Sequence, residues 1–268
     1  MNNRHFCIAA MAAGLALTGT AAAQESQEEL AKQLANPVAA LISVPFQWNY
    51  DQDIGPLDDG TRSYLNFQPV IPVSLNEDWN LISRTIVPLI DQDDIFPGAG
   101  GQSGLGDVVQ SAFFSPVEPT DGGWIWGVGP VFLLPTATDE LLGAEKWGIG
   151  PTAVALRQQG PWTYGGLTNH IVSFAGDGNR SDINATFLQP FVSYTTPDAW
   201  TFTLQTESTY DWEGEQWSIP VSTVATKVTT IGGQLVSIGG GVRYYVDSPE
   251  AGPEGWGVRL VFSLLFPK

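Results

Sequence analysis

The feature that most constrains this chain is a series of short segments in which apolar and polar side chains alternate. The last of them is the clearest, because Val258, Leu260 and Phe262 alternate with Arg259 and Ser263. Neighbouring side chains of a β-strand point to opposite faces, so a period of two with one apolar face predicts a strand. Each segment has the length of about ten residues that a tilted strand needs to cross a bilayer. The pattern favours strands with lipid on one side and a polar interior on the other.

The same alternation recurs along the chain. At 200–210, Trp200, Phe202 and Leu204 alternate with polar residues, and at 42–50 the apolar residues oppose Gln47 and Asn49. Segments are predicted to begin near Val38, Thr61, Trp79, Gly104, Trp124, Trp147, Trp162, Ile183, Trp200, Gln216, Leu235 and Gly255. The predicted fold class is all-β, a transmembrane antiparallel β-barrel of about 12 strands with a short N-terminal periplasmic helix.

Composition supports this class. Only 15% of the residues are charged, whereas the chain holds 10 Trp and 13 Phe. After the N-terminal segment no run approaches the ~18 apolar residues of a membrane helix, so strands are the remaining way to cross. The net charge of -17 argues against nucleic acid as a partner, because phosphates need a basic surface. A soluble secreted β-sandwich remains an alternative.

The N-terminal residues predict secretion. Arg4, an apolar run to about residue 17, and small residues ending at Ala21 and Ala23 make a signal peptide over 1–23. An N-terminal membrane anchor is the alternative, although the apolar run is short for one. Cys7, the only cysteine, falls in this segment, so no disulfide or thiolate ligand is expected in the mature chain. The expected location is the cell outer membrane of a Gram-negative bacterium.

A short helix is predicted before the barrel. Ser26 and Glu29 form a capping box, and Asn36-Pro37 ends the helix. We therefore divide the chain into a signal peptide at 1–23, a periplasmic leader helix at 24–37 and an outer-membrane β-barrel at 38–268.

Connections between the segments alternate in length, as they do in outer-membrane barrels. The predicted inner turns are short, and the predicted outer loops are longer and acidic. The inner turns include Leu75–Asp78, Gln159–Pro161 and Thr196–Ala199, and the outer loops include Asp51–Gly60, Asp91–Ser103, Thr138–Lys146, Gly176–Asp182 and Asp247–Glu254. None of the acidic runs has the spacing of a calcium loop, so we expect solvated loops, or loops that divalent cations bridge to lipopolysaccharide.

Tryptophan placement gives a second sign of a membrane barrel, because amphipathic rings gather at both membrane–water interfaces. Trp79, Trp124, Trp162 and Trp200 directly follow predicted inner turns, and Trp48, Trp147, Trp217 and Trp256 fall near the opposite strand ends. A soluble core would instead place such rings in the middle of the strands.

A faint internal repeat accompanies these features. Gln68-Pro69 precedes Trp79 by eleven residues, and Gln189-Pro190 precedes Trp200 by the same interval. These pairs mark the second and eighth segments. Either duplication of a six-strand unit or chance would explain the two matching pairs.

Several stretches resemble one family of outer-membrane barrels. They are Leu41-Ile-Ser-Val-Pro-Phe-Gln47, Pro69-Val-Ile-Pro-Val-Ser-Leu-Asn-Glu-Asp-Trp-Asn80, Trp126-Gly-Val-Gly-Pro130, Leu134-Pro-Thr-Ala-Thr-Asp139, Lys146-Trp-Gly-Ile-Gly-Pro151 and Leu264-Leu-Phe-Pro-Lys268. The family is known as "MetA-pathway of phenol degradation", and its members are often labelled transporters or neuromedin U. The resemblance implies an outer-membrane barrel that passes small compounds, with aromatic or apolar molecules as candidates. It transfers no catalytic residues. Many barrels end in an aromatic residue that the barrel-assembly machinery reads, and Phe266 is the candidate here.

Enzyme chemistry finds little support. Some outer-membrane barrels are lipid hydrolases with a His and a Ser two apart, but His170 and Ser173 are three apart and so face opposite sides of a strand. A serine from a neighbouring strand remains an alternative. One histidine and no cysteine in the mature chain cannot make a zinc site, and neither a catalytic residue nor a cofactor is predicted.

The polar face of the strands predicts which residues line the lumen. An arginine facing lipid at mid-membrane costs about 2–4 kcal/mol, so the strand arginines should point inward. The predicted lumen-facing residues are Asn66, Gln68, Arg84, Gln205, Glu207, Arg243 and Arg259. They could set selectivity or simply form structural ion pairs. We expect a passive channel for small-molecule solutes; an occluded structural or adhesive barrel and a lipid hydrolase are the alternatives.

Overall fold

The computed structural model describes residues 27–267, so the predicted signal peptide and the predicted cap Ser26 lie outside the described residues. Residues 27–34 form a helix, and strands follow it. Within this range no helix is both long and apolar enough to span a membrane. The strands are β1 (Ile42–Ile54), β2 (Gly60–Phe67), β3 (Val70–Ser74), β4 (Trp79–Asp93), β5 (Gln102–Leu105), β6 (Val108–Pro116), β7 (Trp124–Leu134), β8 (Lys146–Gln159), β9 (Trp162–Gly176), β10 (Asn184–Thr195), β11 (Trp200–Thr206), β12 (Ser208–Asp211), β13 (Gln216–Ile231), β14 (Gln234–Asp247) and β15 (Trp256–Phe266).

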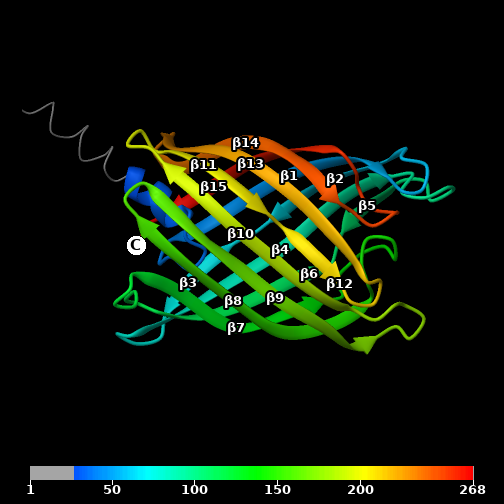
Figure 1. Ribbon diagram of the computed structural model, residues 1–268, viewed down its shortest axis with the longest axis horizontal. Helices are drawn as coiled ribbons and strands as arrows, with labels where there is room; N and C mark the ends of the chain where they lie inside the picture. The colour runs from blue at the N-terminus through cyan, green and yellow to red at the C-terminus, as the bar shows by residue number, and fades with distance from the viewer. Residues whose placement is uncertain (1–26, 268) are drawn as a thin grey trace, which may run out of the picture.

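The strands form one antiparallel sheet that closes on itself through the β1–β15 and β9–β10 pairings. Three of the barrel strands are interrupted, so each consists of two consecutive segments. These are β2 with β3, β5 with β6, and β11 with β12. Counting each such pair once gives a closed barrel of twelve strands, as predicted. Figure 1 shows the strands running at a tilt to the long axis, the geometry that closing a sheet requires.

Prolines explain two of the three interruptions. Between β11 and β12, Glu207 N–H donates to the carbonyl of Pro220 at 3.2 Å, and Pro220 has no N–H to return. Between β2 and β3, Pro69 itself lacks the donor. The pairing register is unchanged across both interruptions, so each barrel strand continues in the same direction. Between β5 and β6 the register slips by one residue opposite Pro88, which makes a bulge.

Eleven of the twelve predicted strand starts lie within two residues of the observed ones, and the alternation of connections holds with small differences. The first strand begins at Ile42 rather than near Val38, because Val38 packs into an apolar cluster inside the barrel. At one end, here called the short-turn end, residues 160–161 and 232–233 make two-residue turns, although 117–123 is longer. The opposite, long-loop end carries the longer connections 135–145 and 248–255. The predicted outer loops Asp51–Gly60 and Asp91–Ser103 are shorter than expected, because β1 and β4 extend through their first residues.

The two faces of the sheet differ as the alternation predicts. On β15, Leu260 is 53% exposed on the outer face, whereas Arg259 is 1% exposed on the inner face. Aromatic pairs gather at both ends of the barrel. At the short-turn end they include Trp79–Trp126, Trp124–Tyr164 and Trp162–Tyr194, and at the long-loop end Tyr210–Trp212, Tyr210–Trp217 and Tyr244–Trp256.

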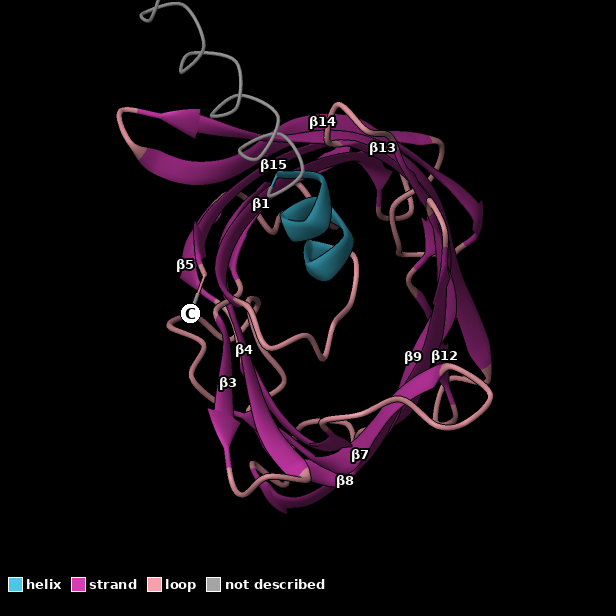
Figure 2. Cartoon of the chain, turned by 90° about the vertical axis from the view of Figure 1, so that its left-hand side faces the viewer, coloured by secondary structure: helices cyan, strands magenta, loops and turns pink. Residues whose placement is uncertain are grey.

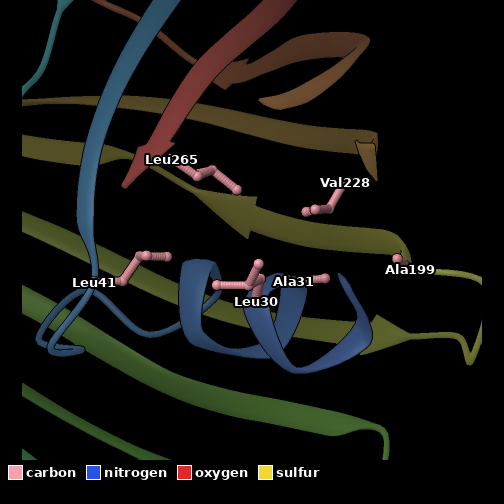
Figure 3. Close-up of a cluster of buried hydrophobic side chains, with 6 residues drawn as sticks. All are labelled: Leu30, Ala31, Leu41, Ala199, Val228 and Leu265. Carbon is pink, nitrogen blue, oxygen red and sulfur yellow. The ribbon is translucent and has the colours of Figure 1, made fainter. Parts of the chain in front are cut away.

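The N-terminal helix lies inside the mouth of the barrel at the short-turn end, rather than ahead of it (Figure 2). Leu30 and Ala31 pack against Leu41, Val228 and Leu265 of the inner wall, with Ala199 completing this cluster (Figure 3). On the polar side, Gln158 Nε2 donates to the carbonyl of Lys32 at 2.8 Å. The helix is short and would be marginal alone, so burial of its apolar side is what holds it.

The segment after the helix crosses the mouth to the opposite wall. Val38 is buried there in a second apolar cluster with Ile82, Phe113, Val154, Leu156 and Leu167. Asn36 Oδ1 accepts the Val38 N–H at 3.0 Å and fixes the turn between them. The chain then returns to Leu41 and enters β1. Residues 27–41 therefore bridge the short-turn mouth from one wall to the other.

Candidate functional site: the bore of the barrel

A cavity inside the barrel has a volume of about 420 Å³ and lies between the helix and the long-loop end. Six of the seven residues predicted to face the lumen line it: Asn66, Gln68, Arg84, Glu207, Arg243 and Arg259. Gln205 lines a second cavity of about 210 Å³, which borders the helix. The structure thus brings all of these residues to the inner surface of one barrel.

Arg259 and Glu207 form the first ion pair of the bore. Arg259 Nη1 lies 3.1 Å from Glu207 Oε1 and Nη2 lies 2.5 Å from Oε2, which is the two-pronged geometry that suits a guanidinium. Arg259 Nε also donates to Asn49 Oδ1 at 2.8 Å. The pair spans the inner surface of β13 and β14. It can do so because Gly241, the partner of Arg259 on β14, presents no side chain to the bore.

Arg243 and Asp51 form the second pair. Arg243 Nη2 lies 2.6 Å from Asp51 Oδ1, and these residues are only 2% and 3% exposed. Tyr64 accepts a hydrogen bond from Arg243 at 2.7 Å, and Tyr245 donates one to Asp51 at 3.1 Å. The pair passes over β15 at Gly257, where an added Cβ would lie 2.6 Å from Asp51 Oδ1. Glycine at 257 is therefore required by the ion pair above it.

Arg84 differs from the other two arginines. Its Nη2 donates to Gln68 Oε1 at 3.2 Å, and no carboxylate lies within 4.0 Å of it among the residues that the structure describes. Arg84 is also partly exposed to the cavity, whereas Arg243 and Arg259 are enclosed by their partners. Of the three arginines that line this cavity, Arg84 is therefore the one without a carboxylate partner in the described part of the chain.

The opposite part of the cavity wall is apolar. Ile86 on β4 pairs with Val109 on β6, which in turn pairs with Leu133 on β7. Beyond β8, the strip continues with Ile171 on β9 and its partner Ala185 on β10. We call these five residues the apolar strip. The two ion pairs therefore lie on β1, β14 and β15 and at Glu207 between β11 and β12, whereas Arg84 lies on β4 next to the apolar strip.

A ring of polar residues separates this cavity from the mouth that holds the helix. Gln68 borders all three bore cavities, Arg84 and Gln189 border the first and third, and Gln47 and Arg259 border the first and second. We call these five residues the polar ring. The second and third cavities, of about 210 and 160 Å³, lie on either side of the helix segment. The polar ring thus lies between the larger cavity and the two smaller ones that flank the helix.

Sequence reasoning missed several residues of this site. Gln47 and Asn49 were recognised as the polar face of their strand but not as site residues. Asp51 was assigned to an outer loop; it is in fact buried in β1 and paired with Arg243. Continuing the alternation Gln47, Asn49 by one step would have found it. Tyr64 and Tyr245 carried no comparable signal, because tyrosine occurs on either face of such strands.

The His–Ser arrangement considered for a hydrolase does not form between the two residues named. His170 Nδ1 lies 2.8 Å from the hydroxyl of Thr186, while Ser173 donates to Asp182 at 3.1 Å. Lys146 Nζ also donates to Asp182 at 3.0 Å, and these two hydrogen bonds lower the pKa of that exposed loop carboxyl. Among the described residues, no three His, Cys, Asp or Glu side chains gather in a way that could hold a metal ion.

Comparison with solved structures supports the fold. The chain resembles the COG4313 outer membrane channel from Pseudomonas putida F1 with a TM-score of 0.66 and 14% identity, over 85% of this chain and 96% of that one. The β domain of the Bordetella autotransporter BrkA gives a TM-score of 0.48 with 13% identity, over 85% of this chain and 100% of that one. The first likeness shows that the two chains share a fold. No family model matches the sequence, and no curated protein does.

Proposed function

We propose that this protein is an outer-membrane channel that passes small molecules passively through the bore of its barrel. The observation that carries the proposal is the bore itself, in which the polar ring borders a cavity of about 420 Å³ on one side and two smaller cavities beside the helix on the other. The apolar outer face and the two aromatic belts fit a bilayer, with the short-turn end and its helix in the periplasm. The mixed lining suits solutes with an apolar part, aromatic ones among them.

An occluded barrel with a structural role is the second candidate. It is favoured by the helix, which is packed into the mouth through a buried apolar cluster. The two candidates differ in one measurable property, because only a channel conducts ions or solutes while the helix is in place.

The first test is to express the chain, isolate outer membranes and compare gel mobility with and without boiling in detergent. We expect a heat-modifiable band in the outer-membrane fraction, because a closed barrel resists detergent until it is heated. The purified protein should then give discrete conductance steps in planar bilayers. A soluble periplasmic product would contradict the membrane assignment, and a stable barrel without conductance would favour the occluded alternative.

Substitution of Leu260 with arginine tests which face meets lipid. Leu260 is 53% exposed near the middle of β15, so the charge should lower the free energy of unfolding by about 2–4 kcal/mol in lipid vesicles. The control is Val246→Arg, on the same outer face but at the long-loop end of β14, where a charge costs only about 0–1 kcal/mol. Urea unfolding followed by tryptophan fluorescence measures both. Equal losses for the two variants would contradict the placement of Leu260 at the middle of a lipid-facing surface.

A further inference from the structure

We propose that the bore binds small amphipathic carboxylates, with the carboxylate on Arg84 and Gln68 and the apolar body along the apolar strip. This inference deepens the proposed function and rests on it, because it names the class of solute that the channel would take. It begins from the contrast among the three arginines of the bore. Two of them are neutralised by carboxylates of the protein, whereas Arg84 is not.

The donors around Arg84 suit a planar anion. A guanidinium has five N–H donors, and the only hydrogen bond of the Arg84 side chain within the described residues is the one from Nη2 to Gln68 Oε1. Gln68 uses its oxygen in that bond, and its NH₂ group donates no hydrogen bond to another described residue. Arginine with a neighbouring amide donor matches the two oxygens of a carboxylate, which arginine binds in a two-pronged fashion.

Arg84 favours a ligand with a single negative charge. Glu207 is held by both prongs of Arg259, and Asp51 is held by Arg243, so each of these carboxylates is already paired. Arg84 is the arginine of the cavity lining without such a partner among the described residues. A monoanion would pair with it one to one, whereas the second charge of a dianion would lie unpaired in a partly desolvated cavity.

The position of Arg84 indicates where the apolar part of the ligand would lie. On β4, Ile86 lies two residues beyond Arg84 on the same inward face and begins the apolar strip. A solute with its carboxylate on Arg84 therefore lays its apolar part along Ile86, Val109 and Leu133. The cavity of about 420 Å³ falls within the range of roughly 300–1,000 Å³ typical of small-molecule sites. The fit is to one apolar ring or short chain bearing one carboxylate.

The test uses the full mature barrel, refolded in detergent, and calorimetric titration with three probes. Benzoate carries both parts of the proposed ligand, benzyl alcohol keeps the ring without the charge, and acetate keeps the charge without the ring. We expect wild-type protein to bind benzoate about tenfold or more tightly than either of the other probes, after subtraction of the signal from empty micelles. Equal binding of benzoate and benzyl alcohol would overturn the inference.

Substitutions assign the binding to Arg84. Arg84→Gln should weaken benzoate binding by about tenfold or more while changing benzyl alcohol binding by less than about twofold. Arg62→Gln is the matched control, because Arg62 also lies on a strand and bonds to a glutamine at 2.9 Å, yet it borders none of the bore cavities. Unchanged benzoate affinity in Arg84→Gln would refute the proposed site. If that variant gives no heat-modifiable band, Arg84→Lys replaces it, because lysine keeps the positive charge but lacks the planar guanidinium. Arg84→Lys should lose part of the benzoate affinity, less than expected for Arg84→Gln.

Binding and conductance can fail separately. Selective benzoate binding by a barrel that conducts nothing would refute the channel but keep the site. A conducting barrel that does not discriminate benzoate from benzyl alcohol would keep the channel and refute the site.

Discussion

Replacement of Asp51 with leucine is expected to lower the free energy of unfolding by about 3–5 kcal/mol. The substitution leaves the guanidinium of Arg243 buried without a counter-charge, in a place where both partners are at most 3% exposed. It also removes the acceptor of the Tyr245 hydroxyl. Urea unfolding of the barrel refolded in lipid vesicles, followed by tryptophan fluorescence, measures the loss.

Two variants separate the cost of an unpaired charge from the worth of the pair. The double variant Asp51→Leu with Arg243→Met should recover most of the stability, since an apolar pair in place of a buried ion pair is often close to neutral. Glu145→Gln breaks the pair with Arg180, in which the two side chains are 43% and 31% exposed, and should cost no more than about 1 kcal/mol. A loss for Asp51→Leu no larger than that of Glu145→Gln would show that water reaches Arg243.

Removal of residues 27–36 should raise the single-channel conductance several-fold. This segment carries the helix that occupies the short-turn mouth, and the two smaller cavities that flank it would then join into one opening. Planar-bilayer recording of the purified barrel measures the change. Barrel closure should survive the deletion, because each barrel strand keeps its partners.

Point substitutions test whether the packing of the helix, rather than its mere presence, narrows the mouth. Leu30→Asp places a charge in the buried apolar cluster and should release the helix, so its conductance should approach that of the deletion. Glu28→Gln breaks only the ion pair with Lys32 along the helix, worth about 0.2–0.5 kcal/mol, and should conduct like wild type. Wild-type conductance in both the deletion and Leu30→Asp would mean that the helix does not limit flow.

Much of the barrel could be predicted from the sequence because its causes are local. Alternation depends on each residue and its chain neighbours, so the strand starts and the face of Leu260 or Arg259 follow from the sequence. The repeat of Gln68-Pro69 and Gln189-Pro190 was also visible, and the structure places both glutamines on the polar ring. Their barrel strands are six apart in a ring of twelve, hence on opposite sides of the bore.

The site could be predicted only in part, because its ion pairs form between strands that the curvature of the barrel wall brings together. Arg243 reaches Asp51 over Gly257, and Arg259 reaches Glu207 across two strands; neither partner follows from spacing along the chain. The docking of the helix is likewise non-local. The capping signal predicts that a helix forms. Its position in the barrel depends on the packing of Leu30 against Val228 and Leu265, which are distant in sequence.

The location of the helix has a consequence for assembly. The first and last strands meet along the seam from Ile42–Phe266 to Tyr50–Val258, the pairing that turns an open sheet into a ring. Leu30 and Ala31 pack against Leu41 just before the first strand and Leu265 within the last, so these contacts need both edges of the seam. Their burial stabilises the sealed ring but not an unsealed intermediate. The helix that narrows the mouth therefore also holds the closed ring together, and loss of its apolar contacts should let the seam reopen faster.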